Sequence, residues 1–125
     1  MRDIKFRAWN TDEDRYVDGF SIRSDGVICS PWGKDKPEWI LEQFTGLRDK
    51  NGREIYEGDI IRDETFKKDI YDIMVVGWEN DAASFVLIKN GWVFMHYFGE
   101  SSNPEDCIVI GNIHENPELI EASHV

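Results

Sequence analysis

Apolar and polar residues alternate in short runs along most of this chain, and turn-forming residues separate the runs. Residues 4–9 show the pattern well, because Ile4, Phe6 and Ala8 fall on one face and charged residues lie between them. Such alternation is typical of a strand that buries one face. The same reasoning predicts strands at residues 16–23, 27–29, 60–62, 70–78, 84–89, 92–98 and 107–113.

Several tight turns are predicted between these strands. The pair Asn90-Gly91 joins two strand patterns, and both residue types tolerate the positive φ that a two-residue hairpin requires. Asp25-Gly26 predicts a second hairpin by the same argument. Residues 49–52, which include Asn51-Gly52, and residues 57–59 predict two further turns.

Three other segments are read differently. Residues 30–38 and 63–69 are rich in charged or turn-forming residues and are predicted to be loops. For residues 39–44 the pattern leaves two alternatives: Ile40 and Phe44 suit a helical turn, whereas alternation from Trp39 suits a strand. The sequence Asn116-Pro117-Glu118 predicts the start of one short C-terminal helix.

These elements together predict a mostly β fold. About eight short strands with frequent turns and one small helix suit a small barrel or sandwich. Residues 59–113 hold five of the strands, in a spacing that suits an SH3-like barrel. The length of 125 residues, with 41% hydrophobic residues, predicts a single β domain over residues 1–125 that can bury a core.

The distribution of apolar and charged residues predicts where in the cell the protein is found. The longest uncharged apolar runs are far shorter than the roughly 20 residues that cross a membrane, so no membrane association is expected. Charged residues interrupt the N-terminal stretch, which therefore does not resemble a signal peptide. The expected location is the cytoplasm, where Cys29 and Cys107 would be two free thiols.

The charge is unevenly distributed. The net charge is −11, and residues 69–125 hold ten acidic residues against one basic residue, Lys89. Residues 1–68 hold 13 basic and 15 acidic residues and are therefore nearly neutral. Non-specific binding of nucleic acid depends on contacts between basic residues and phosphates, so such binding is not expected. A local basic patch at Arg48, Lys50 and Arg53 is the one feature that favours it.

Three stretches together resemble the YopX-like family of phage-encoded proteins. They are residues 4–9 (IKFRAW), 45–61 (TGLRDKNGREIYEGDII) and 110–120 (IGNIHENPELI), in the family's order. Asn10 stands where the family pattern suggests Asp, and His114 where it suggests Tyr. The resemblance implies a mostly β fold and a phage or prophage gene expressed in a bacterial cytoplasm. It implies no activity and no functional residues, because none is established for the family.

The central stretch contains a candidate metal site. Asp49, Glu54, Glu57 and Asp59 are acidic, and carboxylate clusters can bind Ca²⁺ or Mg²⁺. The spacing is not that of an EF-hand loop, and basic residues lie between the acids. Tight turns explain the stretch more simply, so no metal site is predicted. The three histidines also lack the spacing of metal ligands; they are His96, His114 and His124.

No catalytic or cofactor site is predicted either. Cys29 and Cys107 lie in apolar strand patterns, where a thiol is usually a small buried hydrophobe. The chain contains no Gly-rich phosphate-binding motif and no nucleophile elbow around a serine. An enzyme stays open as an alternative only because triad residues can be distant in sequence.

Aromatic residues are abundant in the acidic half. They could form a stacking platform for single-stranded nucleic acid, but such platforms need a basic groove. Core packing and contact between subunits therefore explain them better. The six residues concerned are Trp78, Phe85, Trp92, Phe94, Tyr97 and Phe98.

The sequence therefore favours a non-enzymatic protein-interaction module, an accessory protein of a phage or prophage. The expected partners are further copies of the same chain in a homo-oligomer, and a host or phage protein. One alternative is an acidic inhibitor that mimics nucleic acid when it binds a host protein. Another is a small-ligand binder or enzyme whose site the sequence does not reveal.

Overall fold

The computed structural model describes residues 3–64, 72–100 and 103–122. Within them lie eleven strands, a short 3-10 helix and one short C-terminal helix, so the predicted mostly β fold is confirmed. The contacts divide the chain into two compact units, an N-terminal unit Ile4–Gln43 and a C-terminal unit from Phe44 onward. The two units are described separately, and a single domain over residues 1–125 stays a prediction.

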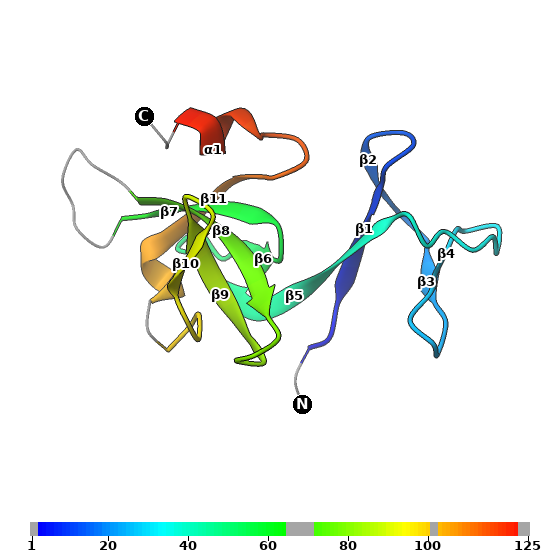
Figure 1. The fold of residues 1–125 in the computed structure, drawn as a ribbon, viewed down its shortest axis with the longest axis horizontal. Coiled ribbons are helices and arrows are strands. Elements are labelled where there is room, and N and C mark those ends of the chain that lie inside the picture. Colours follow the sequence, from blue (N-terminus) through cyan, green and yellow to red (C-terminus); the bar gives the residue numbers. More distant parts are fainter. Residues whose placement is uncertain (1–2, 65–71, 101–102, 123–125) are drawn as a thin grey trace. The chain divides into compact units, whose positions relative to one another are not determined.

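The N-terminal unit is built around strand β1 (Phe6–Asn10). On one side β1 pairs with β2 (Arg15–Val17), and on the other it pairs with the first residues of β5 (Ile40–Arg48), both antiparallel (Figure 1). The alternation read in the sequence is met only in part. Ala8 on β1 is fully buried, but Ile4 and Phe6 of the same predicted face are exposed, and Trp9 of the opposite face is buried.

A small hairpin completes this unit. Strands β3 (Ser21–Ile22) and β4 (Ile28–Cys29) pair antiparallel, and Gly26 in the turn between them has a φ of 89°. This is the hairpin that Asp25-Gly26 predicted. The core of the unit consists of Ala8, Val17, Ile28 and Trp39, against which Phe20 and Leu41 pack.

The C-terminal unit contains a five-stranded antiparallel sheet. Its order is β10-β9-β8-β7-β11, so β10 and β11 are its edges (Figure 1). The strands are β7 (Asp59–Asp63), β8 (Asp72–Glu79), β9 (Ser84–Lys89), β10 (Trp92–Met95) and β11 (Cys107–Asn112).

Three shorter elements surround this sheet. Strand β6 (Glu54–Tyr56) pairs with the second part of β5. The 3-10 helix η1 (Pro104–Asp106) leads directly into β11, and helix α1 (Glu118–Ala122) lies against β8. The sheet curls into a half-barrel. Its core consists of Ile55, Ile61, Met74, Val76, Leu87, Phe98, Cys107 and Val109.

The outer edge of β11 is already hydrogen bonded. The carbonyl of Cys107 accepts the amide of Lys50 at 2.9 Å, and the amide of Val109 donates to Oδ2 of Asp49 at 3.0 Å. Further along, the amide of Asn112 donates to Oδ1 of Asn116 at 3.2 Å. Side chains and loop backbone therefore occupy this edge, where another strand would otherwise pair.

Most of the predicted elements are present. Strand β9 has the predicted bounds, and Asn90 and Gly91 form the predicted turn with φ values of 54° and 79°. The undecided residues 39–44 lie mainly in strand β5, which begins at Ile40 and runs beyond them. The C-terminal helix is also present. The SH3-like topology stays a prediction.

Other predicted elements differ in extent. The strand predicted at residues 16–23 is divided into β2 and β3, because Gly19 has a φ of 77° that extended backbone does not adopt. The strand predicted at residues 92–98 ends at Met95, and Tyr97 has a φ of 53°. The one division at Gly19, together with β5 in the undecided stretch and the unpredicted β6, gives eleven short strands where about eight were expected. Most of the loop predicted at residues 63–69 lies outside the described residues.

Candidate functional site

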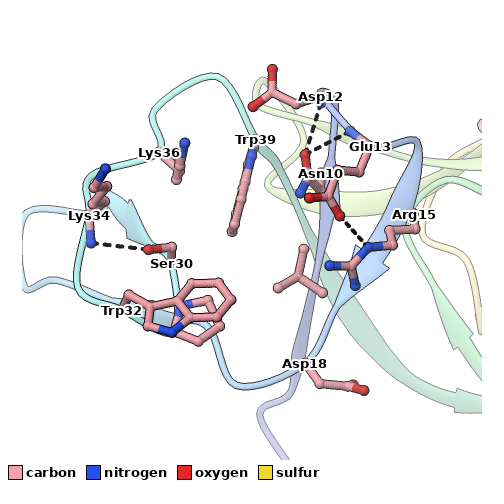
Figure 2. A pocket seen from close by; sticks show the side chains of 12 residues that line it. Asn10, Asp12, Glu13, Arg15, Asp18, Ser30, Trp32, Lys34, Lys36 and Trp39 are labelled. Carbon is pink, nitrogen blue, oxygen red and sulfur yellow. Dashed lines mark hydrogen bonds and ion pairs between the residues drawn. The ribbon is translucent and has the colours of Figure 1, made fainter.

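A pocket of about 410 Å³ lies within the N-terminal unit. One wall comes from β1, β2 and the turn between them, and the other comes from the loop that follows β4 (Figure 2). This volume falls in the range of sites for small molecules, about 300–1,000 Å³. Its lining residues are Asn10, Asp12, Glu13, Arg15, Val17, Asp18, Ser30, Pro31, Trp32, Lys34, Lys36 and Trp39.

The turn between β1 and β2 is fixed by the side chain of Asn10. Its Oδ1 accepts the amides of Asp12 and Glu13 at 2.8 and 3.1 Å, and the residue is buried. A short polar side chain that bonds backbone two residues ahead is a common turn device. Asn10 thereby holds one wall of the pocket, while its amide nitrogen stays available as a donor.

The opposite wall is fixed by Ser30. Its Oγ accepts the amide of Lys34 at 3.1 Å, and its backbone amide donates to the Lys34 carbonyl at 2.7 Å. The tight loop between them carries Trp32, whose side chain is 86% exposed although it is large and apolar. An exposed Trp on a loop that is closed by hydrogen bonds is presented to solvent at a defined place.

Trp39 lies between the two walls (Figure 2) and belongs to the core of the unit. The ammonium of Lys36 lies 5.6 Å from the centre of its ring, within reach of a cation–π interaction. The indole Nε1 is buried and has no hydrogen-bond partner in the described part of the chain. A buried donor without an acceptor costs about 1–3 kcal/mol, so such groups are uncommon.

The charges around the pocket balance. Asp12, Glu13 and Asp18 are opposed by the same number of basic residues. Arg15 is paired with Glu13, with 2.6 Å between Nε and Oε2. The pocket therefore has no strong net charge.

A second candidate surface lies in the C-terminal unit, on and around β10. Trp92 is 79% exposed, and Phe94 and Tyr97 are also exposed. Trp78 is exposed as well, but it lies on β8, where its ring packs edge-on against Phe85. Phe98 is buried, and Phe85 packs partly buried against the core. The aromatic residues singled out in the sequence thus separate into four on the surface and two in the core.

The acidic residues of the central stretch stabilise local structure. Asp49 and Asp59 are buried and accept main-chain amides, Asp59 from Tyr56 at 2.8 Å. Glu54 lies 3.5 Å from the guanidinium of Arg48. Among the described residues no group of three or more potential ligands is placed to hold a metal ion.

The basic residues and histidines do not gather into a site either. Lys50 pairs with Glu64 at 3.4 Å, so acids accompany two members of the Arg48, Lys50 and Arg53 patch. His96 Nδ1 lies 3.2 Å from Glu79 Oε1. The amide of His114 donates to Oδ1 of Asn112, and His124 lies outside the described residues.

Both cysteines are buried and free. Burial raises the pKa of the Cys107 thiol to about 12, and the nearby carboxylates of Asp63, Asp106 and Asp49 add to the shift. A thiol with a raised pKa is a poor nucleophile near neutral pH, because the thiolate is the reactive form. Cys107 therefore acts as a core residue.

Sequence reasoning missed the pocket. Its walls come from residues 10–18 and 30–39, which form no local motif. One signal was present: Trp32 lies in a stretch of Pro, Gly and charged residues, where a large apolar side chain has no reason to be buried.

Comparison with models of known protein families shows to which family this chain belongs. The model described as YopX protein matches residues 5–121. The chain belongs to the YopX family. The match includes the pocket and the strands of both units, so both candidate surfaces belong to the family region of this YopX protein.

A solved structure supports the fold of this YopX family member. The crystal structure of protein EF1440 from Enterococcus faecalis is similar, with a TM-score of 0.68 and 26% sequence identity. The similarity covers 96% of this chain and 99% of that one. No curated protein matches the chain. Among the described helices, none has the length and apolar character needed to cross a membrane.

Proposed function

We propose that this YopX family member is a non-enzymatic protein-interaction module that binds a second copy of itself through strand β10. It acts as an accessory protein of a phage or prophage in the bacterial cytoplasm. The observation that carries the proposal is the set of exposed aromatic side chains on and beside β10, in which Trp92 is 79% and Phe94 51% exposed. Exposed aromatic patches mark interfaces.

The backbone of β10 offers a second kind of contact. No strand in the described residues pairs with its outer side, so its amides and carbonyls can pair with another strand. Strand addition at an open edge is a common mode of recognition, in which backbone bonds give affinity and side chains give specificity.

The charge near β10 favours a second copy as the occupant. Residues 84–98 contain no acidic residue and one permanently charged residue, Lys89, which lies over the ring of Phe94 at 5.4 Å. Two copies with a net charge of −11 repel each other over most of their surfaces. At this strip the acid in contact is Glu79, which lies 3.2 Å from His96, so the repulsion there is smaller than over the rest of the surface.

Backbone geometry also supports a functional role for the end of β10. Tyr97 has a φ of 53°, and a bulky residue in this region costs of order 1 kcal/mol. The next residue, Phe98, is buried and its amide donates to the Phe85 carbonyl at 2.9 Å. The strained turn leaves Tyr97 on the surface, where it extends the aromatic strip.

The experiment is a mass measurement by light scattering after size exclusion, at tens of micromolar protein. The wild type should have a mass well above the 14.6 kDa of one chain. The double variant Trp92→Glu/Phe94→Glu should be monomeric, because it brings four acids into the contact. Trp32→Ala is the matched control, since it removes an exposed Trp from the other unit and should leave the mass unchanged.

Two results would reject the proposal. A wild type of 14.6 kDa excludes self-association, and an oligomer that survives the double variant places the contact elsewhere. The measurement at about 0.1 M and about 1 M salt separates the forces involved, since salt screens charge contacts and leaves apolar ones. An apolar β10 contact should persist at the higher salt.

A further inference from the structure

We infer that the pocket of the N-terminal unit binds a nucleobase, carried on a free nucleoside or a nucleoside monophosphate. The inference is independent of self-association, because its residues all lie between Asn10 and Trp39. It rests on three properties of the pocket: unused hydrogen-bond donors, an exposed aromatic ring and balanced charge.

Three side chains that line the pocket have hydrogen-bond donors without a partner in the described part of the chain. Trp39 is 7% exposed, lines the pocket, and its Nε1–H has no partner among the described residues. Ser30 is buried, and its hydroxyl already accepts the Lys34 amide, so its proton remains to be donated. Asn10 uses its Oδ1 for two backbone amides, which leaves its NH₂ group as a donor. A ligand that meets these three donors must carry several acceptors.

This requirement disfavours the obvious alternative. Tryptophans beside acids often bind ammonium groups, as in aromatic cages. The ammonium group itself carries no acceptor for the indole N–H, however, and alone would leave that buried donor unsatisfied. Nucleobases carry several ring nitrogens and carbonyl oxygens that accept hydrogen bonds in one plane.

Trp32 supplies a face on which a base can stack. Its ring is 86% exposed and stands at the pocket on a loop closed by the bonds between Ser30 and Lys34 (Figure 2). A tryptophan face stacks with any base, because every base has a π-face.

The charge of the pocket walls indicates how many phosphate groups the bound nucleoside carries. Three acids, Asp12, Glu13 and Asp18, balance Arg15, Lys34 and Lys36. A polyphosphate needs a clear excess of positive charge, which this pocket lacks. The ammonium of Lys34 has no ion-pair partner in the described part of the chain and can meet one phosphate. The ligand is therefore neutral or carries a single phosphate.

Titration calorimetry on the full chain tests this. The probes are adenosine, guanosine, cytidine, uridine and their 5′-monophosphates, with ribose 5-phosphate as the probe without a base. At least one nucleoside or monophosphate should bind saturably with a Kd below about 1 mM. A monophosphate that binds more tightly than its nucleoside identifies the phosphate-bearing form, and equal affinity identifies the nucleoside.

Variants locate the site. Trp32→Ala changes an exposed residue and should weaken binding by about 5- to 150-fold, the usual loss of one stacking partner. Trp39→Phe keeps a ring and removes the N–H, and should weaken binding by about 3- to 10-fold. Ile113→Ala, an exposed apolar residue of the other unit outside both proposed surfaces, is the control that should bind as the wild type does. Circular dichroism confirms that each variant is folded.

Three outcomes would overturn the inference. The first is the absence of saturable binding by every probe. The second is binding that neither Trp32→Ala nor Trp39→Phe weakens, since the site would then be elsewhere. The third is binding of ribose 5-phosphate as tight as that of the nucleotides, since the base would then not be recognised. None of these results affects the mass measured for self-association.

Discussion

The side chain of Asp49 accepts the main-chain amide of Val109 at 3.0 Å, across 60 positions of sequence. The other oxygen of the same carboxylate accepts the amides of Asn51 and Arg53, each at 2.9 Å. One buried carboxylate thus closes the turn after β5 and holds strand β11. Hydrogen bonds to a charged acceptor are stronger than neutral ones. Asp49 therefore ties the central stretch of the family pattern firmly to strand β11, which leads into the closing stretch.

Asp49→Asn should destabilise the protein by about 2–3 kcal/mol, because an amide can replace one oxygen but turns a donor toward another main-chain donor. Urea unfolding measures the free-energy change. Asp81→Asn is the control, since Asp81 is an exposed turn residue and its change should stay within about 0.5 kcal/mol. Equal effects of the two substitutions would show that the Asp49 bonds do not contribute specifically.

Gly111→Ala should also destabilise the protein, by about 1–3 kcal/mol, through overpacking. A Cβ at Gly111 would lie 2.7 Å from Cγ of Asn116, whose Oδ1 is held by the amide of Asn112. Gly77→Ala is the matched comparison, because the atom it meets at 2.6 Å is the flexible end of Ile88. Thermal unfolding should show the larger loss for Gly111→Ala, and the reverse order would contradict this account.

The raised pKa of Cys107 predicts a loss of stability at alkaline pH. The unfolded thiol ionises near its ordinary pKa of 9.0, while the folded thiol stays protonated up to about pH 12. Between these values the folded state binds more protons, so raising the pH favours unfolding, by up to about 1.4 kcal/mol per pH unit. Urea unfolding at successive pH values checks this, and Cys107→Ala should show a smaller slope. An unchanged slope would refute the assignment.

Both cysteines should react as free thiols once the chain is unfolded. Cys29 and Cys107 are buried, which should slow their alkylation in the native protein. Mass spectrometry after alkylation in denaturant should therefore find two modified cysteines, and in native conditions fewer. A protein with fewer than two reactive thiols in denaturant would contain a disulfide and contradict the prediction.

Duplex DNA should not bind at physiological salt. The net charge rises only from −11 to −8 when the three histidines are protonated, and acids accompany Arg48 and Lys50. Repulsion therefore opposes the approach of a polyanion. Fluorescence anisotropy at about 0.15 M salt should give no Kd below about 1 μM, and tighter binding would refute this.

The sequence predicted an element correctly where the backbone conformation depends on the residues of that element alone. Asn90-Gly91 was predicted as a hairpin turn because both residues tolerate positive φ, and both adopt it. Residues 39–44 could not be assigned, because their strand depends on pairing with β1, where Ala8 lies opposite Leu41. Alternation through residues 16–23 gave no sign of the break at Gly19, since glycine is permitted in a strand as well as in a bend.

The two candidate sites also differ in how far the sequence could predict them. The four exposed aromatics could be named from sequence, because residues 78–98 are rich in them, but their separation from the buried Phe98 depended on the strained turn at Tyr97. The pocket could not be predicted at all. The side chains of Asn10 and Ser30 accept hydrogen bonds from nearby backbone amides, and among the described residues their donor groups stay free for a ligand. The spacing of residues in the sequence does not show this.

The occupied edge of β11 has a consequence for polymerisation. Lys50, Asp49 and Asn116 already bond the outward-facing groups of that strand, so among the described strands the five-stranded sheet can be extended only at β10. A pairing of β10 with β10 uses the same edge in both copies and leaves no site for a third. If the proposed β10 pairing forms, growth through this sheet would terminate at two chains. A fibre of stacked sheets needs two open edges per copy, and the described strands of this sheet offer one.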